Sequence, residues 1–374
     1  MVVRVKVMNR DNTIEELFAL RSIACLSVVL LHAIGAGLQS IPNSNMSKIN
    51  YFFFDSLNML LYFSTPVFIF ISIFLLAYSY RNKPLPENFL HKRASFIFLP
   101  FLFMAFFYSI PYATSIFEWA KKFFLNAAIG DYHGYFILII FQFYLLYIFL
   151  HAFLKKANPK LVVTVAFAIN VAYLSVFHFV QPPNFPHSEY IWERFYWVPF
   201  LGWIFYFALG YYCGFYYEAF VSFLKKHKTL IFIAPFITST VVLYLYHSNL
   251  LIVHSSKRID ILLHATAVAL FIFYAMSHVK TVPSIFIKIS NYSFGIYLLH
   301  MFYISVVDVV YQALSLTYGP VYIVFLFVFS TVASMVTIYF MKNWKYAVYL
   351  IGKVPTTRVK TPKEHWNTGL REAK

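Results

Sequence analysis

Long apolar runs recur along nearly the whole chain, and they constrain its fold more than any other feature. A run of about 20 apolar residues has the length that an α-helix needs to cross the hydrocarbon core of a bilayer. Helices also satisfy their backbone hydrogen bonds within one segment, as a lipid environment requires. We therefore predict an all-α integral membrane protein, a polytopic bundle of about ten transmembrane helices. The runs fall at roughly 17–38, 52–78, 96–115, 134–153, 159–180, 197–217, 229–247, 261–279, 291–313 and 319–342.

Composition agrees with these runs and leaves no stretch long enough for a soluble domain. Of the 374 residues, 61% are hydrophobic and 12% are charged, whereas soluble domains average about 45–50% and about 25%. The first run follows a polar, charged start and contains Arg21, so we expect a retained helix rather than a signal peptide. We expect residues 1–345 to form the transmembrane domain and residues 346–374 to form a short basic cytoplasmic tail.

Lysine and arginine alternate between the segments that join the runs. About 23 of them fall in the terminal segments and every second connection, and about 6 fall in the segments between. Because these residues favour the cytoplasmic side, we predict a multi-pass protein of the cell membrane with both termini cytoplasmic. The net charge of +16 therefore reflects topology, and we expect no nucleic-acid partner. No His/Cys spacing typical of a metal site appears, so we expect no metal.

Ionisable residues inside the runs are few, and each is costly in lipid unless it has a role. Arg21 and His32 share the first run and lie 11 residues apart, which is about three helical turns. Both therefore lie on one helix face, separated by about 16 Å along its axis. The cation suits a phosphate-bearing donor, and the deeper imidazole suits a general base or a nucleophile. The alternative is that Arg21 snorkels to the interface and His32 bonds a neighbouring helix.

Three further features interrupt the apolar pattern. His300 lies in a late run, where spacing alone favours a structural histidine as much as a functional one. Ser290 and Asn291 are residue types that start helices, so we expect the late span to begin beside them. Pro66 falls in the middle of the second run, where it predicts a kink.

These same positions carry a resemblance to a known family. The segment LRSIACLSVVLLH (20–32) resembles the first-helix signature of the acyltransferase 3 family of membrane-bound O-acyltransferases, in which an Arg and a His share one face. Three later blocks are similar to that family's second-helix block, basic loop and late histidine block: STPVFIFISIFLL (64–76), FLHKRASFIFLPF (89–101) and ISNYSFGIYLLH (289–300). The matches follow the family's order and spread across most of the chain.

Within the family, segments 134–146 and 202–218 resemble the membrane protein of intercellular-adhesin operons. The resemblance implies transfer of an acyl group, acetyl or succinyl, to a hydroxyl of a cell-surface glycan or its precursor. It implies a cytoplasmic acyl-CoA donor (acetyl-CoA or succinyl-CoA) as co-substrate and no permanently bound cofactor. The implied partners are a glycan or glycolipid acceptor, the lipid bilayer and polysaccharide synthase machinery.

The family blocks also imply roles for particular residues. His32 and His300 correspond to catalytic positions, and Arg21 and Arg93 to substrate-binding positions, with Lys92 as a helper to Arg93.

Two departures from the family pattern limit this transfer of roles. Ser72 is followed by Ile73 where the family commonly has Gly, and Phe96 stands where the basic loop commonly has a second Arg. Arg93 is therefore the one arginine of that loop that we assign to the donor side.

Two other functions fit a chain of this kind. An exporter or flippase of exopolysaccharide or lipid-linked precursor would contain inverted repeats and broken helices, which we do not find in the sequence. A non-catalytic scaffold would tolerate loss of His32. Trp192, Trp197 and Trp203 suit stacking on sugar rings, although an interfacial aromatic belt explains each of them singly.

Overall fold

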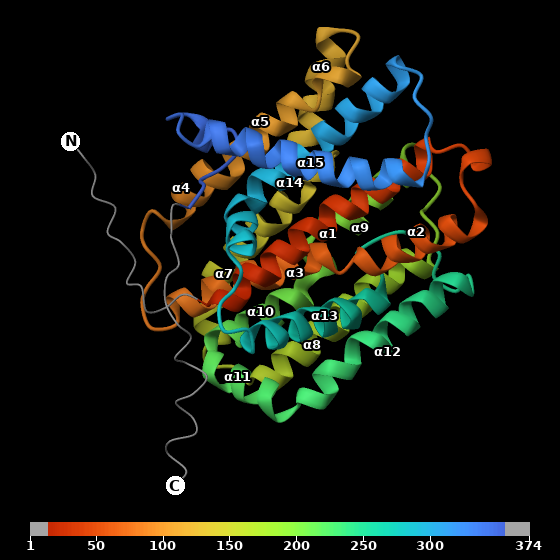
Figure 1. Cartoon of the computed structure of the whole chain (residues 1–374). Coiled ribbons are helices and arrows are strands. Elements are labelled where there is room, and N and C mark those ends of the chain that lie inside the picture. The colour runs from red at the N-terminus through yellow and green to blue at the C-terminus, as the bar shows by residue number, and fades with distance from the viewer. Residues whose placement is uncertain (1–13, 356–374) are drawn as a thin grey trace.

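The structure, a computed structural model, describes residues 14–355, and the regular elements in that range are all helical (Figure 1). The α-helices are α1 (Glu15–Ser40), α2 (Lys48–Leu61), α3 (Ser64–Tyr80), α4 (Phe89–Arg93), α5 (Leu99–Phe107), α6 (Ile116–Phe124), α7 (Phe136–Leu154), α8 (Pro159–Phe179), α9 (Ser188–Trp197), α10 (Ile204–Phe215), α11 (Tyr217–Lys226), α12 (Lys228–His247), α13 (Ile259–Ser277), α14 (Ser284–Ala313) and α15 (Pro320–Met341). Five short π- or 3-10-helical turns matter below: η3 (Ala94–Phe98), η5 (Leu125–Ile129), η6 (His133–Tyr135), η7 (Phe200–Trp203) and η8 (Ala347–Tyr349).

The predicted all-α, polytopic membrane architecture is confirmed. Within residues 14–355, nine helical segments are long and apolar enough to cross a bilayer. The number rises to ten if α9 and the η7–α10 segment, which meet at a bend of 44°, are counted as one span.

Helix α1 runs through the middle of the bundle and packs against α2, α3, α13, α14 and α15. Its apolar residues Leu20, Ala24 and Ile34 are fully buried. Arg21 and His32 therefore project from a helix surrounded by protein, which is the setting that an ionisable residue in a membrane requires.

Helices α3 and α10 approach each other closely through two glycines. A Cβ at Gly210 would lie 2.7 Å from the carbonyl oxygen of Phe70, and a Cβ at Gly214 would lie 2.2 Å from that of Phe74. This Gly-x-x-x-Gly spacing lets the two backbones touch, as small residues do between membrane helices. The contact fixes the back of α3, whose opposite face borders the candidate site described below.

The second predicted run is broken into α2 and α3 at Tyr62 and Phe63, shortly before Pro66. Proline cannot donate the backbone hydrogen bond that would continue the helix across this point. The predicted interruption is therefore present, one turn earlier in the chain than Pro66 itself.

The expected start of the late span beside Ser290 and Asn291 is wrong, because α14 begins at Ser284 after Pro283. These polar residues lie inside the helix, where Ser290 is buried and Ser293 donates a hydrogen bond to the Ser290 carbonyl. The Ser293 hydroxyl is satisfied in this way, and small polar residues of this kind pack between helices instead of starting one.

The chain after α15 turns back onto the bundle. Within it, Ala347 and Ile351 are buried against apolar side chains of α5 and α14. Residues 346–355 of the expected basic tail therefore contact the helices, and residues 356–374 lie outside the described part of the chain.

Candidate active site

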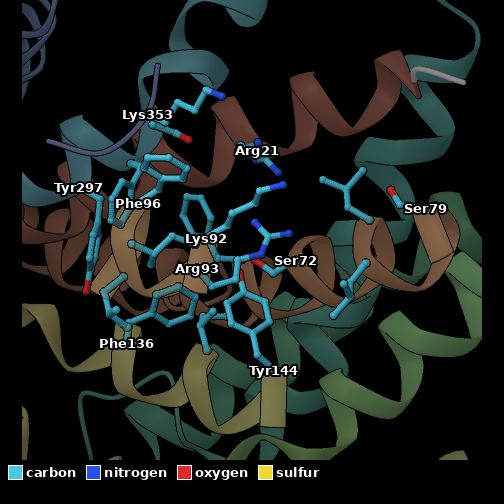
Figure 2. A pocket seen from close by; sticks show the side chains of 18 of the residues that line it. Arg21, Ser72, Ser79, Lys92, Arg93, Phe96, Phe136, Tyr144, Tyr297 and Lys353 are labelled. Carbon is cyan, nitrogen blue, oxygen red and sulfur yellow. The ribbon is translucent and has the colours of Figure 1, made fainter. Parts of the chain in front are cut away.

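A cavity of about 640 Å³ lies at the end of the bundle where α1 begins and α3 ends (Figure 2). Its walls come from α1, α3, α4, η3, α7 and α14, and residues 353–355 border it as well. The volume falls in the range of pockets that hold cofactor-sized molecules, about 300–1,000 Å³.

Four cations line this cavity: Arg21, Lys92, Arg93 and Lys353. Figure 2 shows Arg21, Lys92 and Arg93 directed into the same space. Neither Asp nor Glu is among the lining residues, and none of these cations forms an ion pair within residues 14–355. The guanidinium of Arg93 instead lies 5.1 Å from the ring centres of both Phe89 and Tyr144. Arg21 and Arg93 are partly buried, and Lys92 and Lys353 are exposed. Cations grouped without carboxylates are suited to an anionic ligand.

The α3 wall of the cavity presents hydroxyl groups at regular spacing. Thr65, Ser72 and Ser79 all line it and follow one another at intervals of seven residues. That spacing is close to two helical turns, so the three hydroxyls lie along one face of α3, about 10 Å apart. Between them Phe68, Leu75 and Leu76 add apolar surface. A long ligand with both apolar and amide groups would meet matching partners along this wall.

Three histidines gather beyond the cavity, in the middle of the bundle. The ring centre of His300 lies 5.2 Å from that of His32 and 5.4 Å from that of His133. The three residues come from α14, α1 and the short turn η6 before α7, so distant parts of the sequence meet here.

The hydrogen bonds of His300 define which of its nitrogens is free. Its Nδ1 lies 3.1 Å from the carbonyl oxygen of Ile296, which can only accept, so Nδ1 carries the proton. The Nε2 atoms of His300 and His133 are buried and have no partner within the described structure. Buried ring nitrogens without partners are uncommon, and they are available to a substrate or an intermediate.

Tyr297 joins the cavity to the histidines. Its side chain lines the cavity, and its ring centre lies 5.9 Å from that of His133 and 6.1 Å from that of His300. Its hydroxyl donates a hydrogen bond to the carbonyl oxygen of His133. On α1, Val28 also lines the cavity and is one helical turn before His32 on the same face. The inner end of the cavity is therefore separated from the histidines by about one layer of side chains.

The sequence-predicted site residues fall into two neighbouring groups. Arg21 and Arg93 border one cavity, and His32 and His300 are in contact just beyond it. Lys92, expected as a helper, lines the same cavity.

Two residues of this region were not predicted from the sequence. His133 lies at the edge of an apolar run, so hydropathy gave no signal for it. Lys353 lies in the segment expected to be a tail. Its proximity to the cavity depends on how the chain turns after α15, which no local pattern indicates.

Several other ionisable residues within the spans have structural partners. Asp308 accepts hydrogen bonds from Ser40 and Tyr322. His264 lies 3.1 Å from the carbonyl oxygen of Leu60. Trp203, one of the tryptophans considered for sugar stacking, is fully buried and donates to the Trp197 carbonyl, so it offers no open ring face.

Comparison with known protein families agrees with this arrangement. Residues 14–340 match the Acyl_transf_3 family model, described as an acyltransferase domain. The chain belongs to the acyltransferase 3 family. The match covers nearly all of the described chain and includes α1 through α15 up to Phe340.

Individual relatives carry two kinds of name. A Bacillus subtilis (strain 168) protein named "Putative membrane-bound acyltransferase YfiQ" is 38% identical over 348 residues, covering 91% of this chain and 95% of the relative. A Staphylococcus aureus (strain Mu50 / ATCC 700699) protein named "Probable poly-beta-1,6-N-acetyl-D-glucosamine export protein" is 28% identical, covering 76% and 81%. A Staphylococcus epidermidis protein of the same name is 28% identical, covering 76% and 79%. No solved structure matches this chain.

Proposed function

We propose that this membrane acyltransferase moves an acetyl or succinyl group from a cytoplasmic acyl-CoA to a hydroxyl of a cell-surface glycan or its precursor. The observation that carries the proposal is the pairing of two features. A cavity lined by unpaired cations ends beside a cluster of three histidines, and Tyr297 contacts both. Acyl-CoA has the matching chemistry, with phosphates at one end and a thioester at the end of a long amide-bearing arm.

The cations and hydroxyls would hold the donor. Arg21, Lys92 and Arg93 would bind its phosphates, since charge-assisted hydrogen bonds to phosphate are strong. The hydroxyls of Thr65 and Ser72 would meet the amides of the arm, which runs along α3 toward Tyr297. The lysine- and arginine-rich connections favour an orientation in which this end of the bundle faces the cytoplasm.

The histidines would carry the chemistry. As His32 takes the proton of the acceptor hydroxyl, the oxygen attacks the thioester carbonyl carbon. The carbon–sulfur bond then breaks, and the thiolate of CoA leaves and accepts a proton. Alternatively, His32 attacks first and holds the acyl group before the acceptor takes it. His300 lies close enough to His32 to orient it, and its unprotonated Nε2 could accept a hydrogen bond from the acceptor hydroxyl. His133 lies against His300 and could hold it in place.

Export of a polysaccharide is a second candidate function, favoured by the names of the 28%-identical relatives. It would use the bundle as a path for a glycan and would place no chemical demand on His32. The two candidates therefore predict different outcomes when this imidazole is removed.

The test compares cells that carry wild type, His32→Ala or His91→Ala at matched levels in the membrane. Acyl-ester content and total amount of the purified cell-surface polysaccharide are both measured. Transfer predicts that His32→Ala removes the ester while polymer still reaches the surface. His91 is exposed and lies outside the cavity lining, so its substitution leaves both quantities unchanged. Persistence of the ester in His32→Ala, together with loss of surface polymer, would replace transfer by export.

A further inference from the structure

The segment after α15 borders the cationic cavity and is held there by specific packing. Ala347 and Ile351 are each 2% exposed, and they anchor the segment in an apolar cluster with Ile296 and Leu299 of α14. Gly352 follows with a positive φ of 80°, a conformation that favours glycine. A Cβ at this position would lie 2.3 Å from the Phe294 ring and 3.3 Å from the Phe96 carbonyl oxygen. The chain therefore fits tightly between α14 and η3 just before Lys353.

Lys353 stands between two cavities. It lines the cavity of about 640 Å³ together with Arg21, Lys92 and Arg93. It also lines an adjoining cavity of about 290 Å³, and Phe96 is shared by both. The ammonium of Lys353 lies 5.6 Å from the centre of the Phe96 ring. This residue is thus placed where a ligand would pass from one cavity to the other.

The smaller cavity is also cationic. Its lining includes Lys342, Lys345 and Lys353 and no Asp or Glu. Within residues 14–355 none of these lysines forms an ion pair. Phe96 and Trp344 also line it, so aromatic surface lies beside the charges. Positive charge next to an aromatic face is suited to a phosphorylated nucleoside.

We propose that residues 342–355 form part of the donor site and that Lys353 binds the ribose 3′-phosphate of CoA. This inference rests on the proposed function for the identity of the donor. The arm and the diphosphate of CoA occupy the larger cavity, where Arg21, Lys92 and Arg93 lie. The adenosine end, which carries a third phosphate, enters the smaller cavity past Lys353.

The test measures binding of CoA and of 3′-dephospho-CoA to purified protein in nanodiscs of zwitterionic lipid. The variants are Lys353→Ala and, as a control, Lys280→Ala, an exposed lysine in the loop before α14 that lines neither cavity. A lost charge-assisted hydrogen bond corresponds to about a 10- to 100-fold weaker Kd. We expect Lys353→Ala to weaken CoA binding by that factor and to change 3′-dephospho-CoA binding by less than about 3-fold. Lys280→Ala binds both ligands as wild type does.

Several results would overturn the inference, and they separate it from the proposed function. CoA binding that Lys353→Ala leaves unchanged removes Lys353 from the donor site while the donor itself stands. Equal weakening for both ligands moves Lys353 to the diphosphate and overturns the assignment to the 3′-phosphate. Failure of wild type to bind CoA at all overturns the proposed donor and this inference with it. An effect that appears only in nanodiscs with anionic lipid makes Lys353 a lipid-headgroup contact.

A second pair of variants tests the segment without removing its charge. In Gly352→Ala the new Cβ collides with Phe294 in a positive-φ conformation, so the segment must shift and CoA binding weakens. Gly319→Ala is the control, because a Cβ there meets no atom within 4 Å and φ is −155°. Equal CoA affinity in both variants, with both folded, would contradict a role for the segment in the donor site.

Discussion

Two groups of cations, at opposite ends of the bundle, have opposite environments. At the end where α1 begins, Arg21, Lys92 and Arg93 border an open cavity without a carboxylate. At the other end, where α12 is joined to α13, Arg258 forms two hydrogen bonds to Asp260, of 2.6 and 3.0 Å. The first arrangement leaves charge available to a ligand, and the second uses it to hold the fold together.

Three further cations of the second end also have partners. Asp131 accepts from Lys122 at 2.7 Å and from Arg194 at 2.5 Å, which ties α6 and the turn after η5 to α9. Lys257 lies 5.0 Å or less from the ring centres of Tyr135 and Trp197. The difference teaches that a charged residue in a membrane protein indicates a ligand site only when the fold leaves it without a partner.

The largest expected effect lies at the paired end and concerns stability. Arg258→Gln removes a fully buried guanidinium and leaves Asp260 unpaired. Breaking such a pair costs about 3–5 kcal/mol. We expect a clear drop in the thermal unfolding temperature of the reconstituted protein, with CoA affinity of the folded fraction unchanged. Partial recovery of stability in Arg258→Gln/Asp260→Asn is the control, and a stable single variant would contradict the structural role.

The next effect lies at the open end and concerns binding. Arg21→Gln removes one of the cations that border the large cavity. We expect the Kd for CoA to rise by about 10- to 100-fold, because hydrogen bonds to charged groups contribute about 1.5–3 kcal/mol. The unfolding temperature stays at the wild-type value, since no carboxylate loses a partner. Lys228→Gln, an exposed lysine at the start of α12, is the matched control. If Arg21→Gln loses stability and keeps its affinity for CoA, Arg21 has a structural role like that of Arg258, and the difference between the two groups of cations is contradicted.

A smaller effect is expected where the cavity meets the histidines. Tyr297→Phe keeps the ring and removes the hydroxyl that donates to the His133 carbonyl. Loss of one such hydrogen bond corresponds to about 0.5–1.5 kcal/mol. We expect kcat for acyl transfer to fall by about 2- to 10-fold with the donor KM unchanged. A change in KM alone would make Tyr297 part of the donor wall only.

The last effect, at most about 1.4 kcal/mol per pH unit, concerns the pH dependence of stability at the paired end. Burial lowers the pKa of Lys257 to about 7, and the positive charge of Arg194 acts in the same direction. Between pH values of about 7 and about 10.4, the ordinary lysine pKa, the unfolded chain binds more protons than the folded protein does. The stability of wild type therefore rises across this interval, and that of Lys257→Met does not. The rise is limited because ring faces around Lys257 stabilise its charged form. If the unfolding temperatures of wild type and Lys257→Met change in parallel with pH, the predicted contribution of Lys257 is contradicted.

The membrane spans and part of the candidate site could be predicted from the sequence, for two physical reasons. Hydropathy indicates each membrane helix because lipid requires long apolar segments. The eleven-residue separation of Arg21 and His32 places both on one face of α1, because helical geometry is local. His133 and Lys353 were not predicted, because their positions depend on how the chain turns. The turn η6 and the segment after α15 bring remote parts of the chain together. The early start of α14 was likewise not predicted, since Ser290 and Ser293 are buried inside the helix, where the Ser293 hydroxyl donates to the Ser290 carbonyl.

The contact of His32 with His300 is a second feature that could not be predicted from the sequence. Each residue was singled out within its own helix, and their 5.2 Å ring separation follows from the packing of α1 against α14. Cys25 and Ser293 lie in that interface, where the Cys25 thiol is 3.7 Å from the Ser293 carbonyl oxygen. No spacing along the chain encodes this contact, so tertiary structure is needed to turn two candidates into one site.

The most direct test of the account is a cryo-electron microscopy structure of the protein in nanodiscs with a non-hydrolysable analogue of acetyl-CoA, in which a methylene group replaces the thioester sulfur. We expect density that fills the cavity bordered by Arg21, Lys92 and Arg93, with the acyl end against Tyr297 and facing His32. An empty cavity at saturating analogue, or density at the end where Arg258 and Lys257 lie, would contradict it.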